Sequence, residues 1–140
     1  MTKSQGLGPN VKQVVPFLHA SSLSEVVRFY VDGLGFQMVH QWTPGGELRW
    51  CWLTLGGASI MIQPRGTEPA DHRAISLCFM CDDALAIYEM AKANGLQPDE
   101  PYVGNSLWVT SLVDPDGNRV EFESPTEVPE GTKLSDLAVA

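Results

Sequence analysis

The feature that most constrains the fold is a pattern that occurs in both halves of the 140-residue chain. Residues 22–35 and 82–95 have the same length, carry helix signals and start 60 positions apart (82 − 22). Each follows a β-rich run, VKQVVPFLHA in the first half and RAISLCFMC in the second, and each precedes further strand-like segments. With so short an internal repeat, neither half can bury its sheet alone. The sequence therefore predicts a β-α-β-β-β plan used twice, with the two copies paired with each other or with another chain.

Both helices have recognisable ends. Ser22 and Glu25 show the S-x-x-E spacing of a capping box, and apolar residues then recur at the helical period up to a pair of glycines. In the second half Asp82 or Asp83 can cap the start, and Gly95 ends the pattern. We expect a first module over residues 12–63, a linker over 64–72, a second module over 73–125 and a tail over 126–140.

The run DPDGNRVEFESPT, from Asp114 to Thr126, predicts the last hairpin of the second module. Pro115 favours the second position of a type I turn, and Gly117 can take the left-handed conformation that closes the turn. The turn joins LWVTSLV to RVEFES, so Glu121 lies on the final strand.

Composition excludes several classes of partner and location. The net charge of −8 argues against a nucleic-acid partner, which normally needs a basic face. No run of about 18 apolar residues and no signal-peptide pattern is present, so we expect no membrane partner and a cytoplasmic location. The three cysteines are an odd number, which argues against a disulfide framework. For Cys78 and Cys81, three apart in an apolar run, we expect a buried structural role.

Three segments, FYVDGLGF, DDALAIYEMAKANGL and DPDGNRVEFESP, resemble the vicinal oxygen chelate superfamily of glyoxalase I, extradiol dioxygenases and bleomycin-resistance proteins. The resemblance covers roughly residues 12–125. It implies an α+β fold in which two paired βαβββ modules form a curved mixed sheet around a cleft, usually in a homodimer. The superfamily contains metalloenzymes and metal-free binding proteins, so the fold does not fix the function.

The resemblance also implies four strand positions that hold the metal in the family's enzymes. By counting from the motifs, these fall on Val15, Met61, Ser76 and Glu121. Only Glu121 can bind a divalent ion well, whereas a catalytic metal needs about three protein ligands. We therefore expect no metal and no other cofactor.

The three histidines are further candidates for the site. His72 falls in the expected linker, and His40 has no partner that the sequence assigns. Phe17 and His19 share the strand face that should line the cleft, so His19 is a candidate base or hydrogen-bond donor, with a strand-end packing role as the alternative. Glu121 is the second candidate catalytic residue, as a base or as a partner for a cation.

Tryptophans supply the remaining candidate ligand contacts. Trp50 and Trp52 share a face in RWCWL, and Trp108 lies in LWVT. Aromatic faces bury much area and attract cations, although each tryptophan could instead pack in the core or at a dimer interface. The candidate ligand-binding residues are Phe17, His19, Trp50, Trp52, Trp108 and Glu121.

The hypothesis that follows is a homodimeric, metal-independent protein that binds a small molecule such as a cationic drug or metabolite. One alternative is a metal-dependent lyase or dioxygenase of glyoxalase type that uses non-standard ligands, such as His19 or His40 with Glu121. Another is a purely structural dimerisation module. A filled cleft would favour this second alternative.

Overall fold

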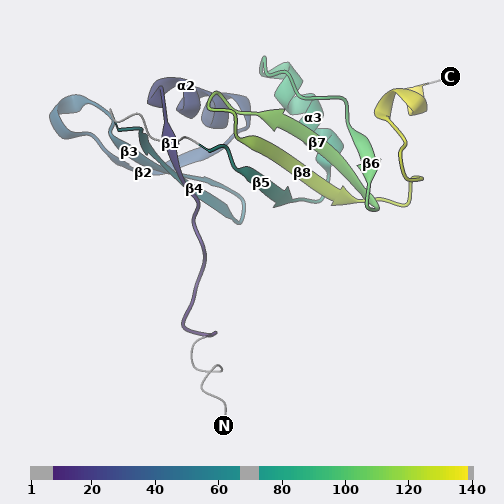
Figure 1. Ribbon diagram of the computed structural model, residues 1–140, viewed down its shortest axis with the longest axis horizontal. Coiled ribbons are helices and arrows are strands. Elements are labelled where there is room, and N and C mark those ends of the chain that lie inside the picture. Colours follow the sequence, from purple (N-terminus) through teal and green to yellow (C-terminus); the bar gives the residue numbers. More distant parts are fainter. Residues whose placement is uncertain (1–7, 67–72, 139–140) are drawn as a thin grey trace, which may run out of the picture.

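The computed structural model describes residues 8–66 and 73–138 and contains two four-stranded sheets, one from each half of the chain (Figure 1). The elements of the first half are β1 (Phe17–Ala20), α2 (Leu23–Val27), the π-helical turn η1 (Arg28–Gly33), β2 (Gln37–Trp42), the 3-10 turn η2 (Pro44–Gly46), β3 (Trp50–Leu55) and β4 (Ala58–Pro64). Those of the second half are β5 (Ser76–Met80), α3 (Ala84–Ala93), β6 (Tyr102–Gly104), β7 (Leu107–Val113), β8 (Arg119–Pro125) and the 3-10 turn η3 (Leu134–Ala138).

The two sheets have the same topology, with strand orders β1-β4-β3-β2 and β5-β8-β7-β6. In each, the first strand runs parallel to the last, and the other neighbours are antiparallel. The predicted plan of two βαβββ modules is therefore confirmed. The shortest strand is β6, the first strand after the second helix, which has only three residues.

The helix starts follow the predicted caps. The Ser22 hydroxyl accepts a hydrogen bond from the Glu25 amide at 3.4 Å. At the second helix, Asp83 is the cap, because its carboxylate accepts from the Ala86 amide at 3.0 Å. Each cap satisfies an amide that the first helical turn leaves without a partner.

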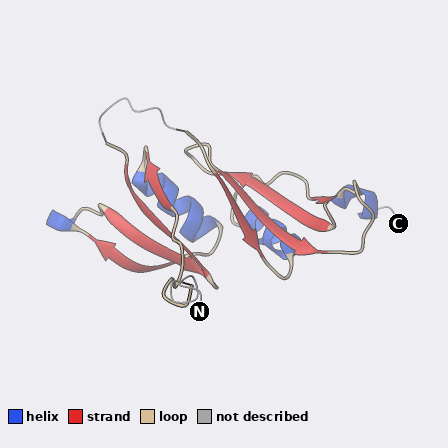
Figure 2. Ribbon diagram, turned by 60° about the horizontal axis from the view of Figure 1, so that its bottom comes forward, coloured by secondary structure: helices blue, strands red, loops and turns tan. Residues whose placement is uncertain are grey.

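Both helices lie on the same side of the sheets, which leaves the opposite face of each sheet open (Figures 1 and 2). Strand residues alternate between the two faces, so every second side chain is buried under a helix. In β3, for example, Cys51 and Leu53 are fully buried, while Trp50 and Trp52, which alternate with them, are half-buried on the other face. None of the described helices is long and apolar enough to cross a membrane.

The two modules share one core, as their repeat predicts. The rings of Phe36 and Phe79 meet edge to face with centroids 5.8 Å apart, and one cluster of buried residues includes side chains from both halves. The side-chain Nδ2 of Asn94 donates a hydrogen bond to the Gly33 carbonyl at 3.0 Å. Gly33 packs so tightly that an added Cβ would lie 2.6 Å from Leu96 Cδ1.

A polar network at the DPDG turn joins the modules at the edge of this core. Asp114 is buried, and its Oδ2 accepts a hydrogen bond from the Tyr30 hydroxyl at 2.8 Å. Its carboxylate also accepts from the Asn118 amide, the Asn118 side chain and the Asp116 amide, each at 2.9 Å. Asp116 in turn accepts from Arg65 at 3.0 Å. The predicted hairpin turn therefore also holds the two modules in a fixed relation.

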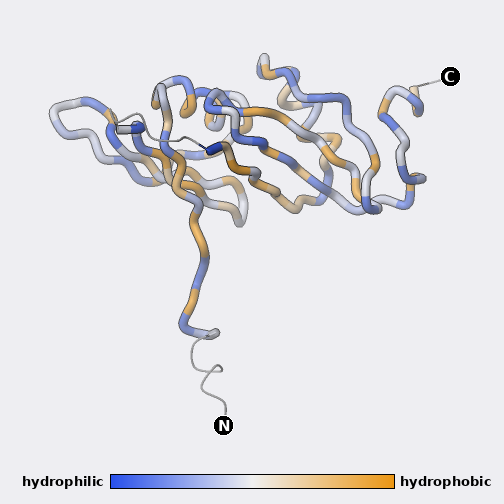
Figure 3. Tube along the Cα trace, in the orientation of Figure 1, coloured by the Kyte–Doolittle hydropathy of each residue, from blue (hydrophilic) through white to orange (hydrophobic). Residues whose placement is uncertain are grey.

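The tail lies along the outer edge of the second sheet. The Val103 amide donates to the Thr132 carbonyl at 2.8 Å, and the Glu130 carboxylate accepts from the amides of Asn105 and Ser106. At the other end of the chain, residues 8–16 extend away from the body (Figure 1), and Figure 3 shows hydrophobic positions along this segment. It includes the exposed Val11 and Val14.

Candidate functional site

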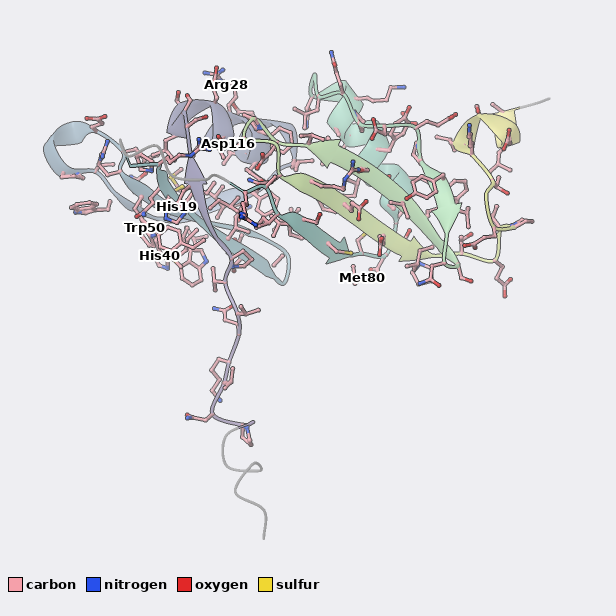
Figure 4. The ribbon with its side chains drawn as sticks, viewed as in Figure 1. His19, Arg28, His40, Trp50, Met80 and Asp116 are labelled. Carbon is pink, nitrogen blue, oxygen red and sulfur yellow. The ribbon has the colours of Figure 1, made fainter. Side chains whose placement is uncertain are left out.

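The open face of the first sheet carries a group of aromatic side chains, which we call the aromatic patch. It consists of Phe17, His19, His40, Trp50, Trp52 and the thioether of Met61. One cross-strand row runs from His40 through Trp52 and Met61 to Phe17, because each residue lies directly opposite the next. Figure 4 shows His19, His40 and Trp50 gathered on this sheet.

Two pairs of rings in the aromatic patch contact each other but stay accessible. Phe17 and His19 stack with centroids 5.2 Å apart, and Phe17 remains 41% exposed. His40 meets Trp52 edge to face at 6.0 Å. The structure thus brings together Phe17, His19, Trp50 and Trp52, four of the residues that the sequence nominates.

His40 is a member of the patch for which the sequence offered no partner. The register of β2 against β3 shifts between Met38 and His40, so a bulge at Val39 resets the alternation of faces. A bulge of this kind leaves no reliable mark on hydrophobic alternation. Strand parity alone could therefore not place His40 beside Trp52.

The open face of the second sheet has a different character, and we call its polar group the acidic patch. It consists of Cys78, Ser111, Arg119, Glu121 and Glu123. Glu121 lies opposite Cys78 on one side and Ser111 on the other. Arg119 Nη1 donates to Ser111 Oγ at 2.6 Å and lies 3.9 Å from Glu121 Oε2. Within the described residues, no hydrogen bond reaches the Glu121 carboxylate, which is 23% exposed.

Cys78 corrects the expectation of a buried role for both cysteines of the CFMC run. Cys78 is exposed and Cys81 is half-buried, and both are free thiols, as is Cys51. The Cys78 thiol donates to Glu123 Oε1 at 3.2 Å. Partial burial of the sulfur and then this hydrogen bond raise the pKa of Cys78 to about 11, so the group is a neutral donor at physiological pH. Apolar neighbours in the sequence misled the prediction, because β5 alternates between faces.

A cavity of about 660 Å³ lies beside the acidic patch, at the free edge of β5. Its walls come from the turn between β3 and β4, from β5 and from α3, and include Leu55, Cys78, Phe79, Cys81, Ile87 and Phe122. The surface next to the carboxylates therefore has room for a small organic group.

Trp108 lies apart from both patches. It is 6% exposed and packs in a small core cluster with Ala84 and Val103, on the face of β7 that α3 covers. Its strand neighbours explain the placement, because Val109 and Ser111 alternate with it and face the open side. We therefore do not include Trp108 in the candidate site.

The two candidate catalytic residues lie on different sheets. His19 belongs to β1 in the first module, and Glu121 belongs to β8 in the second. No hydrogen bond or ion pair joins them within residues 8–66 and 73–138. His72, the third histidine, lies outside the described residues.

The four counted metal positions lie on or beside the two sheets. Met61 lies opposite Phe17 and Glu121 lies opposite Cys78, whereas Val15 precedes β1 and Ser76 lies opposite Arg119. The counted positions carry an isopropyl group, a thioether, a hydroxyl and one carboxylate, and the residues opposite Met61 and Glu121 add a phenyl ring and a thiol. This set does not fit the histidine and carboxylate ligands of a catalytic metal. In the described part of the chain no three His, Cys, Asp or Glu side chains cluster closely enough to hold an ion.

Comparisons with known proteins agree with this geometry. The model of the Glyoxalase/Bleomycin resistance protein/Dioxygenase superfamily matches residues 12–122. No curated protein matches the sequence significantly.

Several solved structures have the same fold. TioX from Micromonospora sp. ML1 is 20% identical, with a TM-score of 0.70 over 82% of this chain and 99% of that one. A bleomycin resistance determinant encoded on transposon Tn5 is 23% identical, with a TM-score of 0.66 over 84% and 100%. A bleomycin-binding protein in complex with bleomycin is 22% identical, with a TM-score of 0.64 over 81% and 98%. At these identities the structures establish the fold alone. The family match covers most of the chain, and the chain therefore belongs to the glyoxalase/bleomycin resistance protein/dioxygenase superfamily.

Proposed function

We propose that this chain is a metal-independent binding protein for a small planar aromatic molecule that carries a cationic group. The observation that carries the proposal is the aromatic patch, whose rings lie on a sheet face that no described helix covers. Buried aromatic contact supplies most of the affinity in such sites, and tryptophan is the strongest partner for a cation. Structural likeness to bleomycin-binding proteins supports the same class of ligand.

The acidic patch supports the cationic part of the proposal. Glu121 is partly desolvated, yet no hydrogen-bond donor in the described residues contacts its carboxylate. A carboxylate in this state gains more from a ligand cation than a fully solvated one. The chain as a whole is acidic, with a net charge of −8, which favours the approach of cations.

We further propose a homodimer in which the open faces take part in the interface. Large apolar side chains stay exposed on or beside these faces in the single chain, among them Phe17, Trp42, Met80, Tyr102 and Val113. Exposed apolar surface of this extent is typical of an interaction site. A cytoplasmic location remains part of the proposal, and three free cysteines are compatible with a reducing compartment. Light scattering coupled to size exclusion tests the dimer.

The proposal is tested by titrating chelator-treated protein with bleomycin and with N-methylacridinium, followed by tryptophan fluorescence and calorimetry. We expect saturable binding of at least one of the two. Trp52→Ala should weaken it about tenfold, since an aromatic contact contributes about 1–1.5 kcal/mol. The matched control is Trp108→Phe, which changes a tryptophan of the core and should leave the affinity within about twofold. Equal losses in both variants, or no binding of either compound, would contradict the proposal.

A further inference from the structure

We propose that Arg119 is a tethered counter-cation that competes with the positive group of the ligand for Glu121, and so sets the selectivity of the site for charge. This inference rests on the proposed function, because it concerns the acidic patch, which that proposal assigns to the cationic group of the ligand.

The contacts of Arg119 show how the competition arises. Its Nη1 is held by a short hydrogen bond to Ser111 Oγ, at 2.6 Å, whereas the distance to Glu121 Oε2 is 3.9 Å. The first distance is that of a strong bond, and the second is too long for a hydrogen bond. Ser111 is buried and lies directly opposite Glu121, so it fixes the guanidinium close to the carboxylate without satisfying it.

The exposure of the pair leaves the carboxylate open to a second cation. The Arg119 side chain is 48% exposed, and the Glu121 side chain is 23% exposed. Glu121 is therefore the more desolvated of the two groups, and a ligand cation that approaches it must do so beside the guanidinium that Ser111 holds. An exposed ion pair contributes little by itself, but a fixed positive charge beside a carboxylate repels a second cation at that distance.

The neighbouring charges leave Glu121 as the carboxylate that a ligand cation would contact. The other carboxylate of the patch, Glu123, already accepts a hydrogen bond from the Cys78 thiol. Arg119 is the only cation that the described strands place on this face of the second sheet, which also carries Glu121 and Glu123. Removal of Arg119 therefore makes the face more acidic without disturbing a buried contact other than that of Ser111.

The test compares Arg119→Gln with the wild type by using two probes of the same shape, N-methylacridinium and acridine, at a mildly alkaline pH where acridine is neutral. The matched control is Arg28→Gln, which removes the same charge from the helix side of the molecule (Figure 4). We expect Arg119→Gln to tighten binding of N-methylacridinium about threefold to tenfold and to leave acridine within about twofold. Arg28→Gln should change neither.

The outcomes separate this inference from the function on which it rests. Suppose that both probes bind, but that Arg119→Gln leaves the affinity for N-methylacridinium unchanged, lowers it, or raises the affinity for both probes equally. The role proposed for Arg119 is then wrong, and the binding function stands. An equal gain in Arg28→Gln would likewise overturn it, because net charge alone would explain the effect. If neither probe binds the wild type or the variant, this inference fails, and the proposed function fails as well when bleomycin also does not bind.

Discussion

The hydrogen bond between Tyr30 and Asp114 gives the sharpest test of how the two modules are held together. Tyr30 is fully buried in the first module, and its hydroxyl donates at 2.8 Å to a carboxylate of the second. Tyr30→Phe removes this donor and leaves Asp114 with its other donors. A hydrogen bond to a charged group contributes about 1.5–3 kcal/mol. Because three donors to Asp114 remain, we expect the lower end, about 1.5–2 kcal/mol of lost stability.

The reciprocal change should cost more. Asp114→Ala leaves both the Tyr30 hydroxyl and the Asn118 side chain buried without their acceptor, for a loss of about 3–5 kcal/mol. In the double variant the losses should fall short of the sum by about 1–2 kcal/mol, since the two groups contact each other.

Urea unfolding followed by tryptophan fluorescence measures all four corners of this cycle. Tyr102→Phe is the matched control, because Tyr102 is 44% exposed and should change stability by less than about 0.5 kcal/mol. A Tyr30→Phe variant as stable as this control, or strictly additive losses in the double variant, would refute the reasoning that the turn joins the modules energetically.

Three further predictions follow from the same geometry. Burial and then the nearby Asp114 charge raise the pKa of Tyr30, so the tyrosine keeps its proton in the folded state at a pH where the unfolded chain releases it. The free energy of unfolding should therefore fall as the pH rises above about 10. In unfolding measured against pH, Tyr30→Phe should show a smaller decline. The raised pKa of Cys78 predicts slow alkylation at neutral pH, with a rate that increases towards a pH of about 11. Glu123→Gln should increase the rate at neutral pH, which mass spectrometry of the labelled peptide can check. An unchanged rate would mean that the hydrogen bond does not control the reactivity of the thiol. Gly33→Ala should destabilise by about 1–3 kcal/mol because its Cβ meets Leu96, whereas Gly57→Ala, with open space around it, should stay within about 0.5 kcal/mol in thermal unfolding.

The sequence predicted the modules because their signals are local. Caps at Ser22 and Asp83 and the turn at Gly117 depend on residues a few positions apart, so each can be recognised without knowledge of the rest of the chain. The repeat then required the modules to pair. The contacts that join them, such as Tyr30 with Asp114, link residues 84 positions apart and left no pattern to recognise.

Part of the candidate site could also be predicted, because strand alternation is a local signal. Strand parity placed Trp50 and Trp52 on one face correctly, because β3 is regular. Parity could not say which face of β7 the helix covers, and Trp108 lies under it. Cys78 appeared buried because the residues of β5 are almost all apolar, although every second one faces outward. Registers between strands, which decide that Cys78 lies beside Glu121, are a property of the folded sheet.

The central claim is that the open faces bind an aromatic cation without a metal. Isothermal titration of chelator-treated protein with N-methylacridinium, repeated after addition of Ni²⁺, tests it most directly. The proposed function predicts saturable binding in the chelated protein with the same affinity when Ni²⁺ is present, because the strand positions around Glu121 and Met61 lack a set of metal ligands. Binding that appears only after Ni²⁺ is added would contradict the account and would show that metal ligands come from residues outside these positions.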